Sequence, residues 1–304
     1  MGLIWALVEQ QRSAGTAATT LSSVLNTTFP VHNMHIDVYS QKISTGASSN
    51  LVEVQKLQEI HLNTTSGTPE SSIRGQDLAD FHPTALGISP FITVLTAVST
   101  DPMFFAMTYP FSPFPNDPTE PFAMPANRAT TFEMQFIADI AGTFNTYTYD
   151  LTLEGTSVTD KPNPKGYIKF VRDEQTGVVG QALFTRFVAN RLLGIFNFQT
   201  TGFDGLAAAA AVNVTSIRTQ ELTFSRNTVY GPFTPQRAGA LQFLPMITAS
   251  PPIQLVNATH FHNLGINNRV GNLGVDVTRD ANTEIRTVAG AANAYRTYPV
   301  CLVQ

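Results

Sequence analysis

The sequence predicts a mostly β protein of the antiparallel β-sandwich or jelly-roll type, with few short helices. Short apolar segments recur along the 304 residues, and glycine, proline and asparagine separate them. Many of these segments alternate apolar and polar residues, which is the pattern of a strand with one buried face. No long segment has the helical period, apart from the ambiguous residues 51–62. Many short strands of this kind are typical of sandwiches and barrels.

The clearest strand is expected at residues 31–39, where Met34, Ile36 and Val38 point to one side and His35 points to the other. Residues 51–62 fit a helix and a strand equally well. The other expected strands are 91–98, 131–140, 146–153, a hairpin of 166–172 and 178–188 around the turn 173–177, 192–199, 208–215, 220–225, 239–247, 253–261, 273–278, 283–289 and 297–303.

The composition of residues 160–165, with two prolines, an asparagine and charged side chains, predicts a linker. It separates a first β-sandwich at 28–159 from a second at 166–304. Each part is long enough for an eight-stranded jelly roll, so one arrangement is two jelly rolls in tandem. No sequence repeat relates the two parts, and a single sandwich with a long inserted loop stays open as the other arrangement.

The first sandwich contains a segment at 102–125 in which seven prolines alternate with aromatic residues. Proline fixes φ and removes a backbone donor, which predicts a loop rather than a helix or a central strand. The aromatic side chains predict that this loop is ordered and packs on its own domain or on a neighbouring copy. The aromatic residues expected to form subunit contacts are Phe104, Phe105, Tyr109, Phe111 and Phe114.

Residues 1–27 are expected to form an N-terminal arm. Leu3, Leu7 and Val8, with Ile4, share one face of a helix, so the arm is expected to contain an amphipathic turn. Such an arm suits contact with a neighbouring subunit or a lipid surface. The apolar start is too short to span a bilayer and lacks the positive region of a signal peptide.

Charged residues make up only 13% of the chain, and they are distributed unevenly. Residues 1–169 hold 8 Lys and Arg against 15 Asp and Glu, a net −7, whereas residues 170–304 hold 10 Arg and no Lys against 7 Asp and Glu, a net +3. A surface with few charges suits a protein whose faces are covered by other copies. The overall net charge of −4 and the lack of a specific motif argue against general nucleic-acid binding.

The sequence contains no phosphate-binding glycine-rich loop, zinc-protease motif, paired-cysteine metal motif, EF-hand loop or nucleophile elbow. No catalytic or cofactor-binding residue is therefore assigned. The single cysteine, Cys301, excludes an intrachain disulfide. Asp77 with Asp80, and Asp173 with Glu174, could act as acid and base only if they faced each other across a cleft, which a sequence cannot show. Asp173 and Glu174 lie in an expected turn, where acids are ordinary.

One weak metal candidate is the pair His260 and His262, since alternate residues of a strand share a face. His32 and His35 would add ligands if their strand lay alongside. The triplet resembles the HxH opening of the cupin motif, which implies a metal site on a jelly roll. The glutamate that follows in cupins is missing, because residues 263–268 read NLGINN, so no metal is assigned.

These observations favour a structural role over catalysis. The leading hypothesis is a viral capsid subunit, from a phage or a eukaryotic virus, located in the virion, with copies of itself and other coat proteins as partners and without a cofactor. One alternative is a lipocalin- or cupin-like β-barrel that acts as an enzyme or binds a small molecule. The other is a carbohydrate-binding or adhesive β-sandwich, which exposed aromatic residues on one face would indicate.

Overall fold

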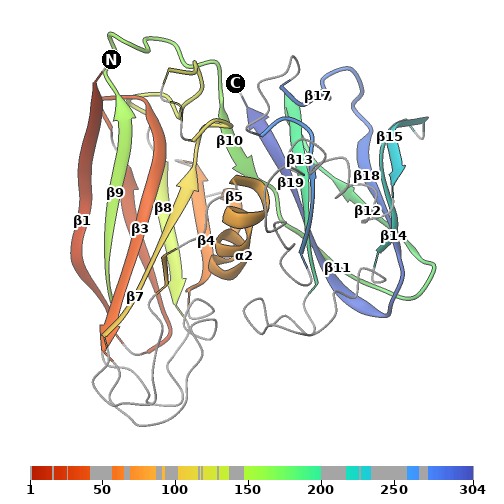
Figure 1. The fold of residues 1–304 in the computed structure, drawn as a ribbon, viewed down its shortest axis with the longest axis horizontal. Coiled ribbons are helices and arrows are strands. Elements are labelled where there is room, and N and C mark those ends of the chain that lie inside the picture. Colours follow the sequence, from red (N-terminus) through yellow and green to blue (C-terminus); the bar gives the residue numbers. More distant parts are fainter. Residues whose placement is uncertain are drawn as a thin grey trace, which may run out of the picture. The chain divides into compact units, whose positions relative to one another are not determined.

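The computed structural model describes residues 2–15, 17–25, 27–41, 57–64, 69–86, 91–92, 102–115, 117, 119–128, 130–136, 147–199, 217–225, 227–233, 259–266 and 273–303. The chain divides into two compact units, which we call unit 1 (Met1–Lys169, with Gln304) and unit 2 (Phe170–Val303). The boundary falls within strand β10 (Tyr167–Phe170). Both units consist mainly of antiparallel strands (Figure 1).

Unit 1 contains two sheets with the strand orders β1-β9-β3-β7-β6 and β2-β8-β4-β5. One short helix and a π-helical turn connect the second sheet back to the first. The elements are β1 (Leu3–Gly15), β2 (Thr19–Leu25), β3 (Val31–Gln41), β4 (Leu57–Thr64), β5 (Pro69–Ile73), α2 (Gly75–Phe81), η1 (His82–Leu86), β6 (Phe91–Ile92), β7 (Pro102–Pro110), β8 (Thr130–Phe136) and β9 (Tyr147–Thr156).

The strands of unit 1 pair in a nested order. Apart from the short β6, the first strand pairs with the last (β1 with β9), and then β2 pairs with β8, β3 with β7 and β4 with β5. Additional pairing of β3 with β9 and of β4 with β8 completes the two sheets. This is a long antiparallel ribbon rolled up on itself, the topology of a jelly roll.

Unit 2 repeats this nested order with its own strands. β11 pairs with β19, β12 with β18, β13 with β16 and β14 with β15, and the sheets are completed by pairing of β13 with β19 and of β14 with β18. Its elements are β11 (Asp173–Gly177), β12 (Ala182–Arg186), β13 (Arg191–Gln199), β14 (Ile217–Phe224), β15 (Asn227–Phe233), β16 (Thr259–Asn263), β17 (Val275–Asp276), β18 (Thr283–Ala289) and β19 (Asn293–Val303). The predicted antiparallel sandwich class is confirmed, and the matching pairing in both units shows two jelly rolls in tandem.

Each unit has its own hydrophobic core. In unit 1 the strands alternate as the sequence predicts, and Met34, Ile36 and Val38 on β3 are fully buried. In unit 2 one core cluster contains Phe187, Leu192, Ile195, Leu222, Val277, Ile285 and Cys301. Cys301 is thus a buried apolar residue of the last strand. Burial of these side chains supplies most of the free energy that offsets the conformational entropy lost when the chain folds.

The N-terminal segment is not a free arm with a helical turn. Leu3–Gly15 forms strand β1 and pairs along β9, while Thr19–Leu25 forms β2 and pairs with β8. The apolar residues that suggested a helix alternate instead, with Leu3 and Leu7 exposed and Ile4 less exposed. Edge pairing to β9 satisfies the backbone of this segment, which is why a strand forms here.

The proline- and aromatic-rich segment 102–125 is a loop only in its second half. Pro102 and Pro110 are the first and last residues of β7, where a missing N–H leaves the ladder intact. The following residues form the expected ordered loop, which packs on unit 1 itself. The Phe111 amide donates to the His32 carbonyl (2.7 Å), and the Asn33 side chain donates to the Pro115 carbonyl (2.9 Å).

The segment expected to be a linker belongs to unit 1. Lys161 is buried, and its ammonium group donates to His32 Nε2 (3.1 Å) and to the Glu120 carbonyl. The Lys165 amide donates to the Pro121 carbonyl (2.7 Å). Burial, with the nearby ammonium group, lowers the pKa of His32 to about 4, and burial lowers the pKa of Lys161 to about 8. This polar cluster fastens residues 157–165 to the loop after β7.

Other expectations have mixed outcomes. The turn expected at 173–177 is strand β11, which pairs with β19, so the predicted hairpin is wrong. Of the ambiguous segment 51–62, the described part belongs to strand β4. Strands expected at 208–215 and 239–247 lie outside the described residues. Among the described residues, no helix is both long and apolar enough to cross a bilayer.

The close packing of Gly155 on β9 against the backbone of Pro30 can be tested by substitution. A Cβ on Gly155 would lie 2.1 Å from the Pro30 carbonyl oxygen, so Gly155→Ala is expected to lower the free energy of unfolding by about 1–3 kcal/mol. Gly2→Ala is the matched control, because no atom lies within 4 Å of its added Cβ. Chemical denaturation measures both; equal stability of the two variants would contradict the tight packing at Gly155.

A buried histidine predicts acid sensitivity. His82 Nε2 lies 2.7 Å from the Thr108 carbonyl oxygen, and burial lowers the pKa of His82 to about 4. The unfolded chain takes up this proton near pH 6.5, so His82 is expected to reduce stability by about 3 kcal/mol as pH falls from 6.5 to 4. Denaturation of wild type and His82→Gln at pH 7 and pH 4.5 isolates this contribution. Parallel pH dependences of the two proteins would refute it.

Candidate assembly surface

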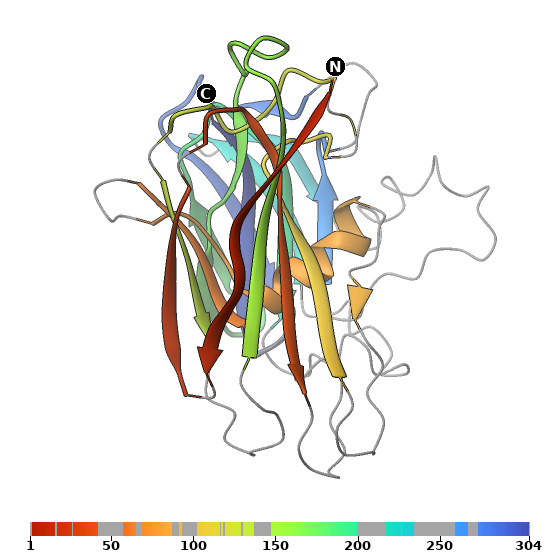
Figure 2. The same ribbon diagram turned by 90° about the vertical axis from the view of Figure 1, so that its left-hand side faces the viewer.

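Unit 1 presents one broad sheet face away from its core. This face, which we call the outer face, consists of the outward side chains of β1, β9, β3 and β7. Figure 2 shows these strands toward the viewer, with no described helix in front of them. The outward residues used below are Leu3, Trp5, Leu7, His35, Asp37, Tyr39, Phe104, Asp150 and Glu154.

An exposed apolar stripe follows the edge strand β1. Leu3, Trp5 and Leu7 are 47%, 58% and 55% exposed. The indole of Trp5 stacks on the His35 ring, with centroids 5.2 Å apart and planes inclined by 22°. These rings lie on β1 and β3, so the indole reaches across β9. Among the described strands β1 is the edge of its sheet, and a fixed aromatic ring with apolar neighbours at such an edge is typical of an interaction surface.

Hydrogen bonds hold the polar residues beneath Trp5 in place. His35 Nε2 lies 3.0 Å from Glu154 Oε2, and His35 Nδ1 lies 3.1 Å from the Thr108 hydroxyl. The Asn33 amide also donates to Glu154 Oε2, at 3.0 Å. Burial alone would raise the pKa of the Glu154 carboxyl, but the hydrogen bonds from His35 and Asn33 lower it below its usual value. The imidazole under Trp5 is therefore held by both nitrogens.

Two carboxylates face each other farther along the outer face. Asp37 on β3 is the direct cross-strand neighbour of Asp150 on β9. Burial, and the charge of Asp150, raise the pKa of Asp37 above its usual value. Among the described residues, no lysine or arginine pairs with either carboxylate. Like charges in directly opposite positions destabilise a sheet, so we expect this pair to reduce the stability of unit 1, although the Gln11 amide donates to Asp150 Oδ1.

The structure corrects the expected contact set. Phe105, Tyr109 and Phe111 are fully buried in unit 1, and Phe114 is only 7% exposed, so these four side chains are core residues rather than a contact surface. On β7 the alternate residues Phe105 and Tyr109 point to the core, where the Tyr109 hydroxyl bonds to that of Ser71 (2.5 Å).

Phe104 is the member of the predicted set that lies on the outer face. It is half-buried, and its ring centroid is 4.8 Å from that of Tyr39. Its role as a subunit contact stays a prediction. Nothing in the sequence groups Trp5, Asp37 and Asp150 with Phe104, because these residues share a face only through the pairing of β1, β3 and β9.

The His260 side chain lies outside the described residues, so a metal site at His260 and His262 stays a hypothesis. His262 on β16 is buried, and its Nδ1 lies 3.5 Å from the Tyr230 hydroxyl. His32 and His35 lie on β3 of unit 1, where His32 contacts Lys161 and His35 contacts Glu154. No group of three histidine, cysteine, aspartate or glutamate side chains in the described ranges is placed to hold a metal ion.

The two carboxylate pairs considered in the sequence do not have the geometry of a catalytic acid and base. Asp77 and Asp80 are both buried on the short helix α2. Asp173 and Glu174 are adjacent residues of β11, so their side chains point to opposite faces of that strand. Neither pair faces across a cleft in the way that carboxylate-based hydrolysis requires.

The neighbouring residues Phe104 and Phe105 give a paired test of this geometry. Phe105→Ser is expected to lower the free energy of unfolding by about 3–5 kcal/mol, since it empties a core position. Phe104→Ser changes the outer face and is expected to cost much less. Denaturant titration of both variants measures the difference; equal losses would contradict the assignment of opposite faces.

Comparison with known proteins gives a consistent fold. No protein-family model and no curated protein sequence matches this chain. Among solved structures, the major capsid protein of Sulfolobus Turreted Icosahedral Virus aligns with a TM-score of 0.72 at 11% identity, over 100% of this chain and 97% of that one.

Two further capsid structures show the same likeness. VP54 of PBCV-1, fitted into a reconstruction of the virophage Sputnik, aligns with a TM-score of 0.65 at 8% identity, over 99% of this chain and 94% of that one. The major capsid protein P2 of bacteriophage PM2 aligns with a TM-score of 0.59 at 7% identity, over 100% and 98%. The chain therefore has, along its whole length, the jelly-roll fold of viral major capsid proteins.

Proposed function

We propose that this protein is a structural subunit of a viral capsid, located in the virion, and that it has no catalytic role. The observation that carries the proposal is the fold. Two jelly rolls in tandem align over 100% of this chain and 97% of a viral major capsid protein. The low fraction of charged residues, 13%, supports it, because such a surface suits faces covered by neighbouring copies.

The jelly rolls themselves suit the role of a building block. Each has two sheets with its own buried core, so it supports loops and exposed faces on a rigid body. Copies of this chain are the partners that we propose first, and other coat proteins are further candidates.

We propose the outer face of unit 1 as a contact surface, with a second copy of this chain as its occupant. Unit 1 carries 8 basic and 15 acidic residues, a net −7, whereas unit 2 carries 10 arginines and 7 acids, a net +3. The carboxylates Asp37 and Asp150 would gain a counter-charge from an exposed arginine of unit 2, such as Arg279, which is 79% exposed. Residues 3–15 then contact a neighbour as strand β1 rather than as an arm.

Light scattering after size exclusion, with electron microscopy of the same fractions, tests the function directly. A capsid subunit is expected to give regular particles or discrete oligomers, because contacts of this kind bury on the order of 1,000 Å² or more. A monomer of 33.0 kDa at every concentration and salt condition would contradict the proposal.

Substitutions on the outer face test the contact surface. Trp5→Ser and Leu7→Ser are expected to weaken assembly and to leave unit 1 folded, because both side chains are exposed. Val24→Ser is the matched control, since Val24 is 68% exposed on β2 of the other sheet. If all three variants assemble like wild type, the outer face is not the contact.

Substitution of Asp37 in the carboxylate pair is expected to change subunit stability and assembly in opposite directions. Asp37→Asn removes the repulsion with Asp150, so the isolated subunit is expected to gain about 0.5 kcal/mol of stability. The same change removes a charge that attracts a basic partner, so assembly is expected to weaken. Denaturation of dissociated subunits and light scattering of assembled ones measure the two effects; a variant that assembles more tightly would disprove the role of Asp37.

A further inference from the structure

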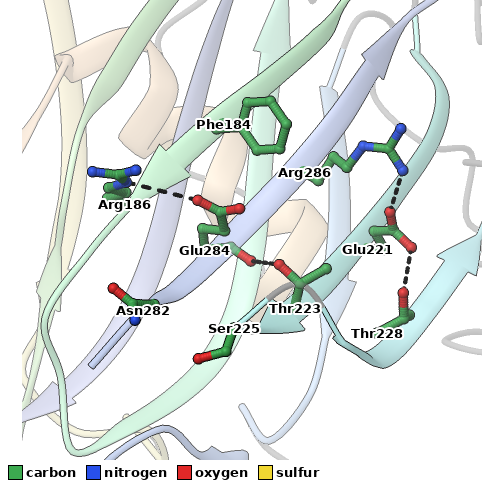
Figure 3. A pocket seen from close by; sticks show the side chains of 9 residues that line it. All are labelled: Phe184, Arg186, Glu221, Thr223, Ser225, Thr228, Asn282, Glu284 and Arg286. Carbon is green, nitrogen blue, oxygen red and sulfur yellow. Dashed lines mark hydrogen bonds and ion pairs between the residues drawn. The ribbon is translucent and has the colours of Figure 1, made fainter. Parts of the chain in front are cut away.

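A groove of about 860 Å³ lies on unit 2, on the exposed side of the sheet β12-β18-β14-β15. Its residues alternate with the core residues of the same strands, so they come from one face. Figure 3 shows their side chains gathered above the sheet. The volume lies in the range of small-ligand sites, and nothing in the assembly role described above uses this face.

The strand register arranges the groove side chains in two rows. In one row Phe184 on β12 is opposite Arg286 on β18, which is opposite Glu221 on β14. In the next row Arg186 is opposite Glu284, which is opposite Thr223. The groove therefore presents a regular array of donors and acceptors with one aromatic ring at its β12 side (Figure 3).

The charges of the array are balanced, and hydrogen bonds hold Glu221 in place. Arg286 donates to Glu221 Oε1 (2.6 Å), and the Thr228 hydroxyl donates to Glu221 Oε2 (2.8 Å). Arg186 Nε lies 3.7 Å from Glu284 Oε2. Burial would raise the pKa of Glu221, but the bonds from Arg286 and Thr228 lower it below its usual value. Two arginines against two glutamates give no net charge, which disfavours a polyanion such as a nucleic-acid backbone.

The aromatic ring narrows the class of ligand. Phe184 is 47% exposed, and the rest of the groove lining is polar or charged. A neutral ligand rich in hydroxyl groups matches this lining, because each hydroxyl both donates to a carboxylate and accepts from a guanidinium group. The C–H face of a pyranose ring packs on an aromatic ring in the same way as other apolar surface. A peptide strand would instead add to a sheet edge, whereas this groove lies on a sheet face.

We propose that this groove of unit 2 binds a neutral oligosaccharide. Phe184 packs against one sugar ring, and Arg186, Glu284 and Arg286 hydrogen-bond to its hydroxyls. Asn282 and Thr228 extend the polar lining on either side. The groove residues differ from the residues proposed for assembly, which are the outer face of unit 1 and Arg279, so the two proposals are tested separately.

An array of neutral and sialylated oligosaccharides, probed with the full chain, tests the proposal, and calorimetry with the best neutral glycan follows. Neutral glycans are expected to bind, and Phe184→Ala and Glu284→Gln are each expected to weaken binding about tenfold. Val188→Ala is the matched control, because Val188 is an 84% exposed apolar residue just after β12 that does not line the groove.

Thermal unfolding of each variant verifies that unit 2 remains folded. The proposal is overturned if no neutral glycan binds at millimolar concentration, or if only sialylated glycans bind. It is also overturned if Phe184→Ala binds like wild type, or if Val188→Ala loses as much affinity as Phe184→Ala. Particle formation is scored separately, so failure here leaves the assembly proposal unaffected.

Discussion

The fold of each unit depends on pairing between its first and last strands. β1 pairs with β9 and β11 pairs with β19, so each roll is closed by residues that lie more than a hundred positions apart in the sequence. Such closure is entropically costly and is repaid only when both sheets bury their inner faces together. Burial of the core side chains of β3, β8 and β13 therefore stabilises the pairing of the first and last strands, and that pairing in turn brings these side chains together. The outer face of unit 1 and the groove of unit 2 exist because this closure fixes which strands are neighbours.

Much of the fold could be predicted because interior strands carry a plain alternation. The strands at 31–41, 130–136 and 283–289 were expected nearly where they lie. Strands at an edge or bounded by prolines lack this plain alternation. β7 begins and ends with proline, so its sequence predicted a loop. It is in fact a strand that pairs with β3 and, for part of its length, with β6. β1 exposes Leu3, Trp5 and Leu7 at an edge, and its apolar residues fitted a helical period by coincidence.

The surfaces were harder to predict than the fold, for a related reason. Adjacent aromatic residues such as Phe104 and Phe105 look alike in sequence, and only the pairing of β7 decides which one is buried. Asp37 and Asp150, or Phe184 and Arg286, become neighbours through register alone. Lys161 resembled a solvated linker residue, yet its ammonium group lies against His32. A single sequence carries no local trace of such long-range pairings, whereas the burial pattern of a strand is local.

The nested pairing has a consequence for how such a chain can be built. Because the first and last strands of a roll are neighbours, the chain enters and leaves that roll along the same edge region. A complete roll can then be joined to another by a single covalent connection, with no strand exchanged and no loop threaded. Duplication of one coding segment would yield a two-roll chain in one step. Each half would afterwards be free to diverge in charge, which agrees with an acidic first roll and an arginine-rich, lysine-free second roll.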